Sequence, residues 1–264
     1  MLNFFLKNIL SDKINLFFFL NLENIKKMNV KDFINLIKDG EIETCKNLIS
    51  RSETLKIDLN SYDEKNRTLF WYCCYFGCKT LIESLFEKKS IDYNKHDNEG
   101  ITPFLISVWS GHHELVRFLL TSGDSGKIDY NKPDKNGYTS FSSVCKSGDM
   151  KMFNILFENE NISKETLTNE NETPLLLACM NNNILIIEAL VSKRDCINLN
   201  INQPNKNGLT PLFRVCWHEN FEAAKLLFRI EDIDINLGCF GYTPLGISLI
   251  NKNKQLTDLI LKYK

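Results

Sequence analysis

A short motif returns along this chain at a nearly constant spacing, and this repetition limits the possible folds more than any other feature. In one clear copy it reads EGITPFLISVWSG, where Thr102 precedes a proline and an apolar run. Successive copies are 34, 37, 34, 37 and 33 residues apart, and their threonines are Thr68, Thr102, Thr139, Thr173, Thr210 and Thr243. A weaker earlier copy places Gly40 37 residues before Gly77. Such a period predicts a stack of small, similar units.

Each copy carries signals for a pair of helices. Threonine caps a helix, and proline at the first helical position loses no hydrogen bond, as in Thr102-Pro103. Nine residues later we expect a left-handed residue to end the first helix. The candidates are Gly77, Gly111 and Gly148, with Asn182, Asn220 and Asn253 at or beside that place in the later copies. A second amphipathic helix follows, with an apolar stripe such as Leu115, Val116, Leu119 and Leu120.

The segments between the helix pairs predict a tight turn and an extended connection. Two residues before each threonine lies a residue that tolerates positive φ: Gly100, Gly137, Gly208, Gly241, Asn66 or Asn171. The extended connections read IDLN (57–60), IDYN (91–94 and 128–131), LNIN (199–202) and IDIN (233–236). The copy after Met152 lacks this signature, so we expect NENISKETLTNENE to be the least regular junction.

These motifs resemble the ankyrin repeat, which has a period of about 33 residues and a Thr-Pro-Leu helix start. The resemblance covers residues 28–264, although the histidine of the family's Thr-Pro-Leu-His is absent from every copy. It implies an all-α ankyrin-repeat solenoid of about seven helix-turn-helix units with β-hairpin-like fingers. The expected units are 28–61, 62–95, 96–132, 133–166, 167–203, 204–236 and 237–264.

The first 27 residues stand apart from the repeats. Their apolar run at 14–22 is too short to span a bilayer, and they lack the charged start and the cleavage site of a signal peptide. Three interpretations of segment 1–27 stay open: a helix that caps the first repeat, a weak membrane anchor, or a start upstream of the natural one at Met28.

The composition argues against several classes of function. The net charge of -1 offers no basic surface, so we expect no nucleic acid partner. Nine cysteines without paired spacings indicate a reducing compartment, and we expect a cytoplasmic, possibly nuclear, monomer. The sequence contains no glycine-rich phosphate loop, nucleophile elbow or His-Glu-x-x-His motif. We therefore expect no enzyme activity, no cofactor and no metal.

The cysteines and histidines have structural interpretations. Four cysteines lie six residues after their threonine, where the ankyrin pattern has alanine, so we expect them to pack in the core: Cys74, Cys145, Cys179 and Cys216. The expected exposed thiols, Cys78, Cys196 and Cys239, lack a nearby histidine and carboxylate. His112 follows Gly111 as histidine does in the ankyrin pattern, which favours a structural role.

The resemblance also implies a binding face. Ankyrin proteins usually contact partners with the fingers and the exposed end of the first helix, on their concave side. The corresponding residues here are Tyr75, Phe76, Trp109, Tyr138, Lys146, Met180, Trp217, His218 and Tyr242, with Phe240 beside them. Tryptophan, tyrosine and methionine are enriched in protein interfaces. The alternative is that these rings pack against the neighbouring repeat, as we expect for Trp71 and Tyr72.

The sequence therefore predicts a non-catalytic protein-interaction module. It would act as an adaptor, a scaffold, or a regulatory or chaperone subunit, and it would bind one or more proteins through the concave face. A membrane-tethered ankyrin scaffold, anchored by segment 1–27, is the alternative, although we do not expect a membrane partner.

Overall fold

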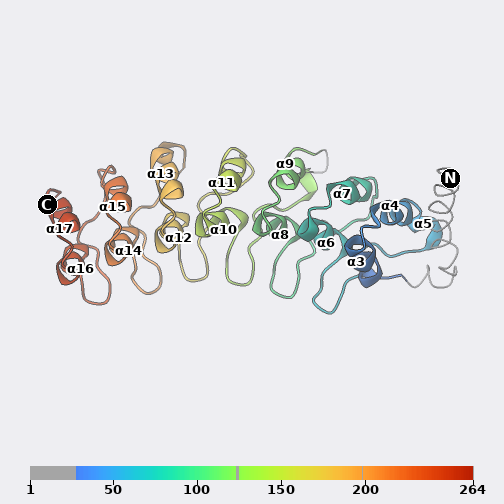
Figure 1. The fold of residues 1–264 in the computed structure, drawn as a ribbon, viewed down its shortest axis with the longest axis horizontal. Coiled ribbons are helices and arrows are strands. Elements are labelled where there is room, and N and C mark those ends of the chain that lie inside the picture. The colour runs from blue at the N-terminus through green and yellow to red at the C-terminus, as the bar shows by residue number, and fades with distance from the viewer. Residues whose placement is uncertain (1–27, 123–124, 198, 264) are drawn as a thin grey trace, which may run out of the picture. The chain divides into compact units, whose positions relative to one another are not determined.

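The computed structural model describes residues 28–122, 125–197 and 199–263, so the interpretations of segment 1–27 lie outside the described residues. The chain divides into two compact units, Met1–Asn98 and Glu99–Lys264. Both are built from pairs of antiparallel helices (Figure 1). Within the described residues there are seven such pairs and no sheet, which confirms the all-α repeat fold.

The first unit contains two helix pairs and one extra turn of helix. Its elements are α3 (Val30–Lys38), α4 (Ile42–Ser50), α5 (Ser52–Leu55), α6 (Leu69–Phe76) and α7 (Lys79–Phe86). The first helices, α3 and α6, pack on each other, and the second helices, α4 and α7, do the same. Each helix thus covers the apolar stripe of its counterpart in the neighbouring pair.

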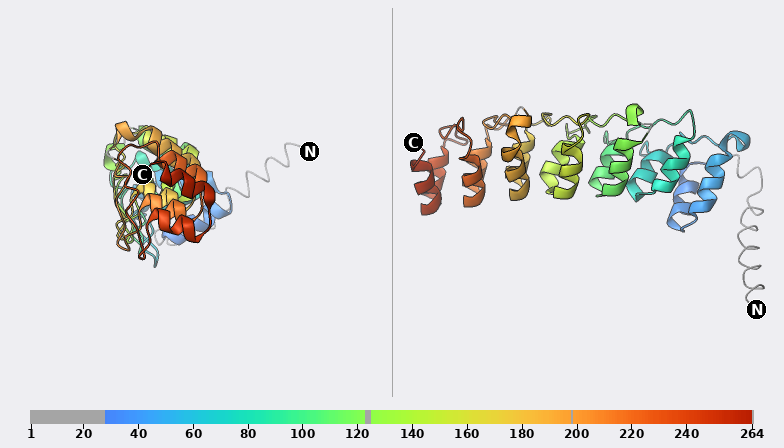
Figure 2. Two further views of the ribbon diagram at one scale, coloured as in Figure 1. Left: turned by 90° about the vertical axis from the view of Figure 1, so that its left-hand side faces the viewer. Right: turned by 90° about the horizontal axis from the view of Figure 1, so that it is seen from above.

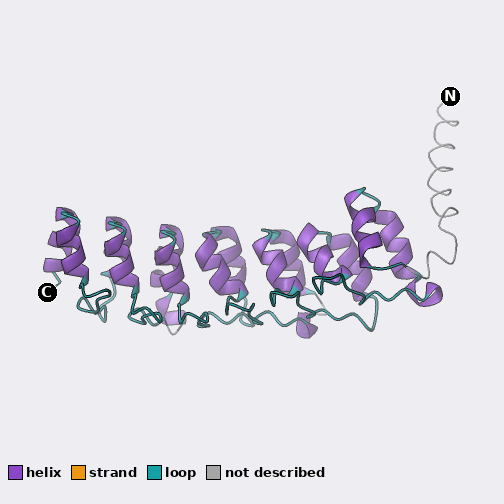
Figure 3. Ribbon diagram, turned by 90° about the horizontal axis from the view of Figure 1, so that it is seen from below, coloured by secondary structure: helices purple, strands orange, loops and turns teal. Residues whose placement is uncertain are grey.

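The second unit continues the pattern with five pairs. Its elements are α8 (Pro103–Trp109), α9 (His113–Thr121), η1 (Ser125–Lys127), α10 (Ser140–Ser147), α11 (Met150–Phe157), α12 (Pro174–Met180), α13 (Ile184–Ser192), η2 (Arg194–Cys196), α14 (Pro211–Trp217), α15 (Phe221–Leu227), α16 (Pro244–Ile250) and α17 (Lys254–Leu261). In this unit the first helices pack in one row and the second helices in another (Figure 1; Figure 2, right). Its connecting loops gather at one end of the helices (Figure 3).

The predicted helix starts are confirmed. Every motif threonine is an N-cap whose Oγ1 accepts a hydrogen bond from the backbone three residues on, at 3.0 to 3.3 Å. The left-handed residue nine positions later is Gly77, Gly111, Gly148 or Asn182 in the first four of these copies. In the last two it is Glu219 and Lys252, while the neighbouring Asn220 and Asn253 cap the second helices.

The fingers are short hairpin turns. In the finger at 134–138, the Asp134 backbone N–H donates to the Tyr138 carbonyl, and Gly137 has a φ of 85°. A Cβ at Gly137 would lie 2.5 Å from the backbone nitrogen of Asn169 in the next finger, so this position requires glycine. Neighbouring fingers join through one backbone bond, such as Asn169 N–H to the Asn136 carbonyl at 2.9 Å.

Asparagines hold successive connections together. Asn131 Nδ2 donates to the Asn161 carbonyl at 2.7 Å, and Asn131 Oδ1 accepts from the Ser163 N–H at 2.8 Å. Asn60 and Asn202 make the same pair of bonds to the connections 30 to 32 residues later. The junction expected to be least regular therefore keeps this contact, because it uses backbone groups of Asn161 and Ser163.

The core lies between the two helix rows of each unit. The four cysteines predicted to pack are buried, and burial raises the pKa of the Cys216 thiol to about 12. The expectation that Cys239 is exposed was wrong. Its side chain is buried, because it lies against the preceding finger, where its Sγ donates to the Asn207 carbonyl at 3.1 Å.

Candidate functional site

One face of each first helix is the candidate site. The residues four, seven and eight positions after the threonine share a face, because they are spaced by three and four along a helix. We call this the first-helix face. The residues seven positions on include Tyr75, Trp109 and Trp217, whose side chains are 43 to 45% exposed. Large aromatic rings thus meet solvent at the same place in three repeats of the two units.

In the first unit, Tyr75 and Phe76 lie beside a shallow hollow. Tyr75 stacks on the buried Trp71, with centroids 5.6 Å apart, and Phe76 is half-buried against Tyr72. The hollow has a volume of about 480 Å³, and its wall includes Lys38 of α3. Tyr72 is half-buried and lines the hollow, so it belongs to this face and is not purely a packing residue as the sequence suggested.

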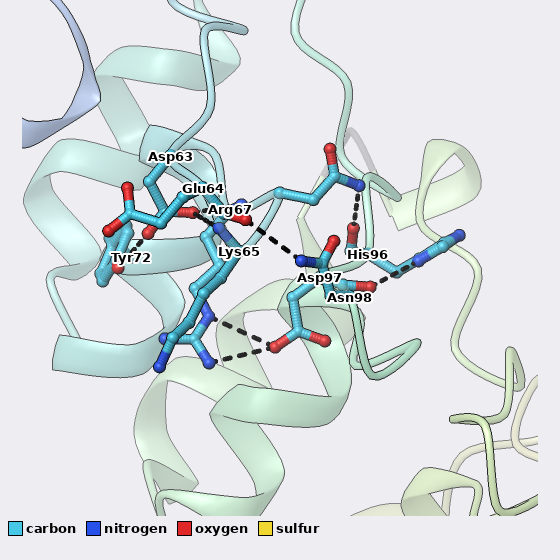
Figure 4. A network of polar contacts seen from close by, with 9 residues as sticks. Asp63, Glu64, Lys65, Arg67, Tyr72, His96, Asp97 and Asn98 are labelled. Carbon is cyan, nitrogen blue, oxygen red and sulfur yellow. Dashed lines mark hydrogen bonds and ion pairs between the residues drawn. The ribbon is translucent and has the colours of Figure 1, made fainter.

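A polar network fixes the finger next to this hollow (Figure 4). Arg67 donates from Nε and Nη2 to the buried Asp97 at 3.3 Å, and its guanidinium lies 4.4 Å from the Trp71 ring centroid. The Tyr72 hydroxyl donates to Asp63 at 2.7 Å. Partial burial raises the pKa of Asp63, but hydrogen bonds from the Arg67 N–H and from Tyr72 outweigh it and hold that pKa below its usual range.

In the second unit, a groove of about 760 Å³ runs between the finger at 134–138 and helices α8 and α10. Trp109, Tyr138 and Lys146 line it, so the structure brings three of the predicted site residues together. Lys146 Nζ lies 4.2 Å from the Tyr138 ring centroid and donates to the Tyr138 hydroxyl at 3.0 Å. The aromatic rings and the ammonium group give the groove an apolar wall with a positive charge on it.

The carboxylates that line this groove already accept hydrogen bonds. Asp134 is buried, and its Oδ1 accepts from the backbone N–H groups of Asn136 and Tyr138. Asp149 caps α11 through the Met152 N–H, and its Oδ2 lies 2.7 Å from His113 Nε2. Both carboxylates keep their negative charge, but some of their acceptor lone pairs are already used by groups of the fold itself.

Further along the face, Met180 is half-buried next to Arg214. The Arg214 Nη2 donates to the Met180 carbonyl at 3.4 Å, and its buried Nε has no hydrogen-bond partner in the described part of the chain. His218 is exposed, and partial desolvation together with the positive charge of Arg214 lowers its pKa. This part of the face is cationic.

The last finger and α14 place another aromatic group on the face. Trp217 lies edge-on to Phe240, with centroids 6.1 Å apart, and Phe240 is 68% exposed at the tip of its finger. Tyr242 is exposed at the base of the same finger. The predicted site residues of the second unit thus form two groups, one around the groove and one around Trp217.

Arg214 was missed by the sequence analysis. It lies four residues after Thr210, on the same helical face as Trp217 and His218, so the spacing of three and four was the available signal. The predicted positions on each first helix were its last two, whereas Arg214 lies one helical turn before them.

No metal-binding arrangement accompanies this face within the described residues. No group of three or more histidine, cysteine, aspartate or glutamate side chains there could hold a metal ion. None of the described helices has both the length and the apolar character needed to cross a bilayer. The face therefore offers aromatic, apolar and cationic side chains for contact.

Known folds resemble this one closely. Solved structures that align with the chain include an ankyrin repeat domain from Acinetobacter baumannii AYE, at 16% identity and a TM-score of 0.64, covering 74% of this chain and 96% of that one. The ankyrin repeat domain of Bcl-3, described as a unique member of the IkappaB protein family, aligns at 17% identity and a TM-score of 0.72, covering 86% and 96%. No curated protein sequence matches the chain.

Family models agree with these folds. A model of ankyrin repeats in three copies matches residues 33–134, and a model of ankyrin repeats in many copies matches residues 175–228. Together they cover more than half of the chain, and the matched segments include helices α4 to α9 and α13 to α15. The chain belongs to the ankyrin-repeat family.

Proposed function

We propose that this protein is a non-catalytic binding protein whose partner proteins dock on the first-helix face and the fingers. The observation that carries the proposal is the repeated exposure of an aromatic ring seven residues after the motif threonine, at Tyr75, Trp109 and Trp217. Exposed aromatic side chains next to polar groups are typical of binding surfaces. Ankyrin repeats generally mediate protein–protein interaction, which agrees with this role.

An adaptor, scaffold, regulatory or chaperone role in the cytoplasm or nucleus follows from this proposal. The nine predicted site residues are its proposed contacts. The tethered-scaffold alternative depends on segment 1–27, which lies outside the described residues, and no observation favours it.

The test compares two variants of the full chain in affinity capture, followed by calorimetry with each purified partner. The face variant carries Tyr75→Ala, Trp109→Ala and Trp217→Ala. The control variant carries Leu185→Ala and Leu261→Ala, which remove exposed leucines from the second helices α13 and α17. We expect the face variant to weaken partner binding at least about tenfold, or about 1.4 kcal/mol, and the control to bind normally.

Circular dichroism melts of both variants establish that they are folded. Partners that bind the face variant as tightly as the unaltered chain would place the binding surface elsewhere and contradict the proposal.

A further inference from the structure

The charged side chains that line the groove beside Lys146 differ in how far the fold already satisfies them. Among its described lining residues Lys146 carries the positive charge, its side chain is exposed, and no carboxylate lies within 4.0 Å of its Nζ. Within the described residues, the Lys146 ammonium group donates to the neutral hydroxyl of Tyr138. By contrast, Asp134 and Asp149 both accept two hydrogen bonds from the fold itself.

This difference decides which charge the groove can receive. A cation entering the groove would compete with the backbone N–H groups and with His113 for the two carboxylates. A carboxylate would meet an ammonium group that has no ion-pair partner among the described residues, next to the Tyr138 hydroxyl, which itself donates to Glu172 Oε2 at 3.5 Å. The surrounding rings of Trp109 and Tyr138 lower the access of water and strengthen that contact.

A second cationic position lies along the same face. Arg214 of α14 has no carboxylate partner among the described residues, and its guanidinium reaches the Met180 carbonyl of α12. Helix α12 packs between α10, which carries Lys146, and α14. Packed helices are about 8 to 10 Å apart, so α10 and α14 are separated by about 16 to 20 Å, and the guanidinium, which reaches back to α12, lies closer to Lys146 than that.

We propose that the groove binds an acidic side chain from an extended segment of a partner protein, with its carboxylate on Lys146 and an adjacent apolar side chain on Trp109. The inference rests on the proposed function, because it names the chemistry of the segment that occupies the same face. A second acidic residue of that segment reaches Arg214. Since an extended chain advances about 3.3 Å per residue, the two acids are at most about six residues apart.

The probe is a phage-displayed library of random dodecapeptides selected on the full chain. We expect the selected peptides to carry an aspartate or glutamate next to an apolar residue, with a second acid within about six residues of the first. Labelled peptides are then measured by fluorescence polarisation against the unaltered chain and single variants. Lys146→Glu should weaken binding at least tenfold, and Lys146→Arg should preserve it.

Two further measurements make the test specific. Lys254→Glu makes the same change of charge on α17 and should leave peptide binding unchanged. Peptides whose acid is replaced by lysine should lose affinity for the unaltered chain and regain it on Lys146→Glu. Binding of the original peptides should also fall as salt is raised, because exposed charges are screened.

The outcomes separate the two proposals. Neutral or basic peptides that need Trp109 but tolerate Lys146→Glu would overturn the acidic preference and leave the binding face in place. Peptides that tolerate both Trp109→Ala and Lys146→Glu would overturn both proposals for this groove. A library that yields no binder would also overturn the acidic-segment inference.

Discussion

Packing explains why a small residue such as cysteine lies six residues after the motif threonine. This position faces the next helix pair, and it is filled by Cys74, Cys145, Cys179 and Cys216, all of which are buried. A thiol is small and weakly polar, so it can replace the alanine of the family pattern without leaving an unpaired hydrogen-bonding group. Burial is therefore expected to lower the reactivity of these four thiols.

Thiol reactivity should follow this burial. Burial raises the pKa of Cys45 and Cys216 to about 12, so at pH 8 the reactive thiolate is only about one part in ten thousand. We expect iodoacetamide at pH 8 to modify the exposed Cys196 first and the half-buried Cys78 slowly. The seven buried cysteines should react only after unfolding in urea. Peptide mass spectrometry checks the order, and modification of Cys74 or Cys145 as fast as Cys196 would contradict it.

At the scale of the element, the helices could be predicted better than their junctions. Thr-Pro and Gly signals act locally, so the helix starts at Thr102 and its equivalents follow from the sequence alone. The left-handed residues Glu219 and Lys252 could not be predicted, because neither type favours that backbone and the position is imposed by the repeat. One contact of the junction after Met152 could not be predicted either. Its contact with Asn131 depends on backbone groups, which no side-chain pattern reveals.

The asparagine contacts between connections should contribute to stability. Asn131→Ala removes two hydrogen bonds to the next connection, and we expect it to lower the free energy of unfolding by about 1 to 2 kcal/mol. Asn136→Ala removes an exposed side chain from a finger tip and serves as the matched control, with a change within about 0.5 kcal/mol. Urea titration followed by circular dichroism measures both. Equal values for the two variants would mean that the Asn131 bonds are no better than bonds to water.

At the scale of the whole molecule, the sequence predicts the repeat family but only part of the site. It identified Trp109, Tyr138 and Lys146 from their place in the repeat, and the structure brings them to one groove. It could not predict which hydrogen-bonding groups stay available there, since that depends on the turn that folds the Asn136 N–H onto Asp134 and on His113, which lies 36 residues before Asp149. The division into two compact units has no signal in the repeat pattern either.

The last helix pair exposes a side that earlier pairs of the second unit cover. Leu261 of α17 is 50% exposed, whereas Leu120, at the same position after its threonine in α9, is 8% exposed. In the same way Leu249 of α16 is exposed, while Cys216 at its equivalent position is buried. A repeat stack gains its stability from the apolar sides that neighbouring pairs cover. Equivalent residues should therefore contribute more to the free energy of unfolding where they are covered than where they are exposed.

The same substitution at these two positions tests this difference. Leu120→Gln buries an amide and removes apolar contacts, so we expect it to lower the free energy of unfolding by about 2 to 4 kcal/mol. Leu261→Gln should change it by less than about 0.5 kcal/mol, because its side chain is already half in water. Urea titrations compare the unfolding midpoints of the two variants, provided that the denaturant slope of the transition is the same in both. A loss at Leu261 as large as that at Leu120 would mean that the end side is covered in solution. Coverage by another molecule would then make the midpoint of the unaltered chain rise with protein concentration, because association stabilises only the folded state.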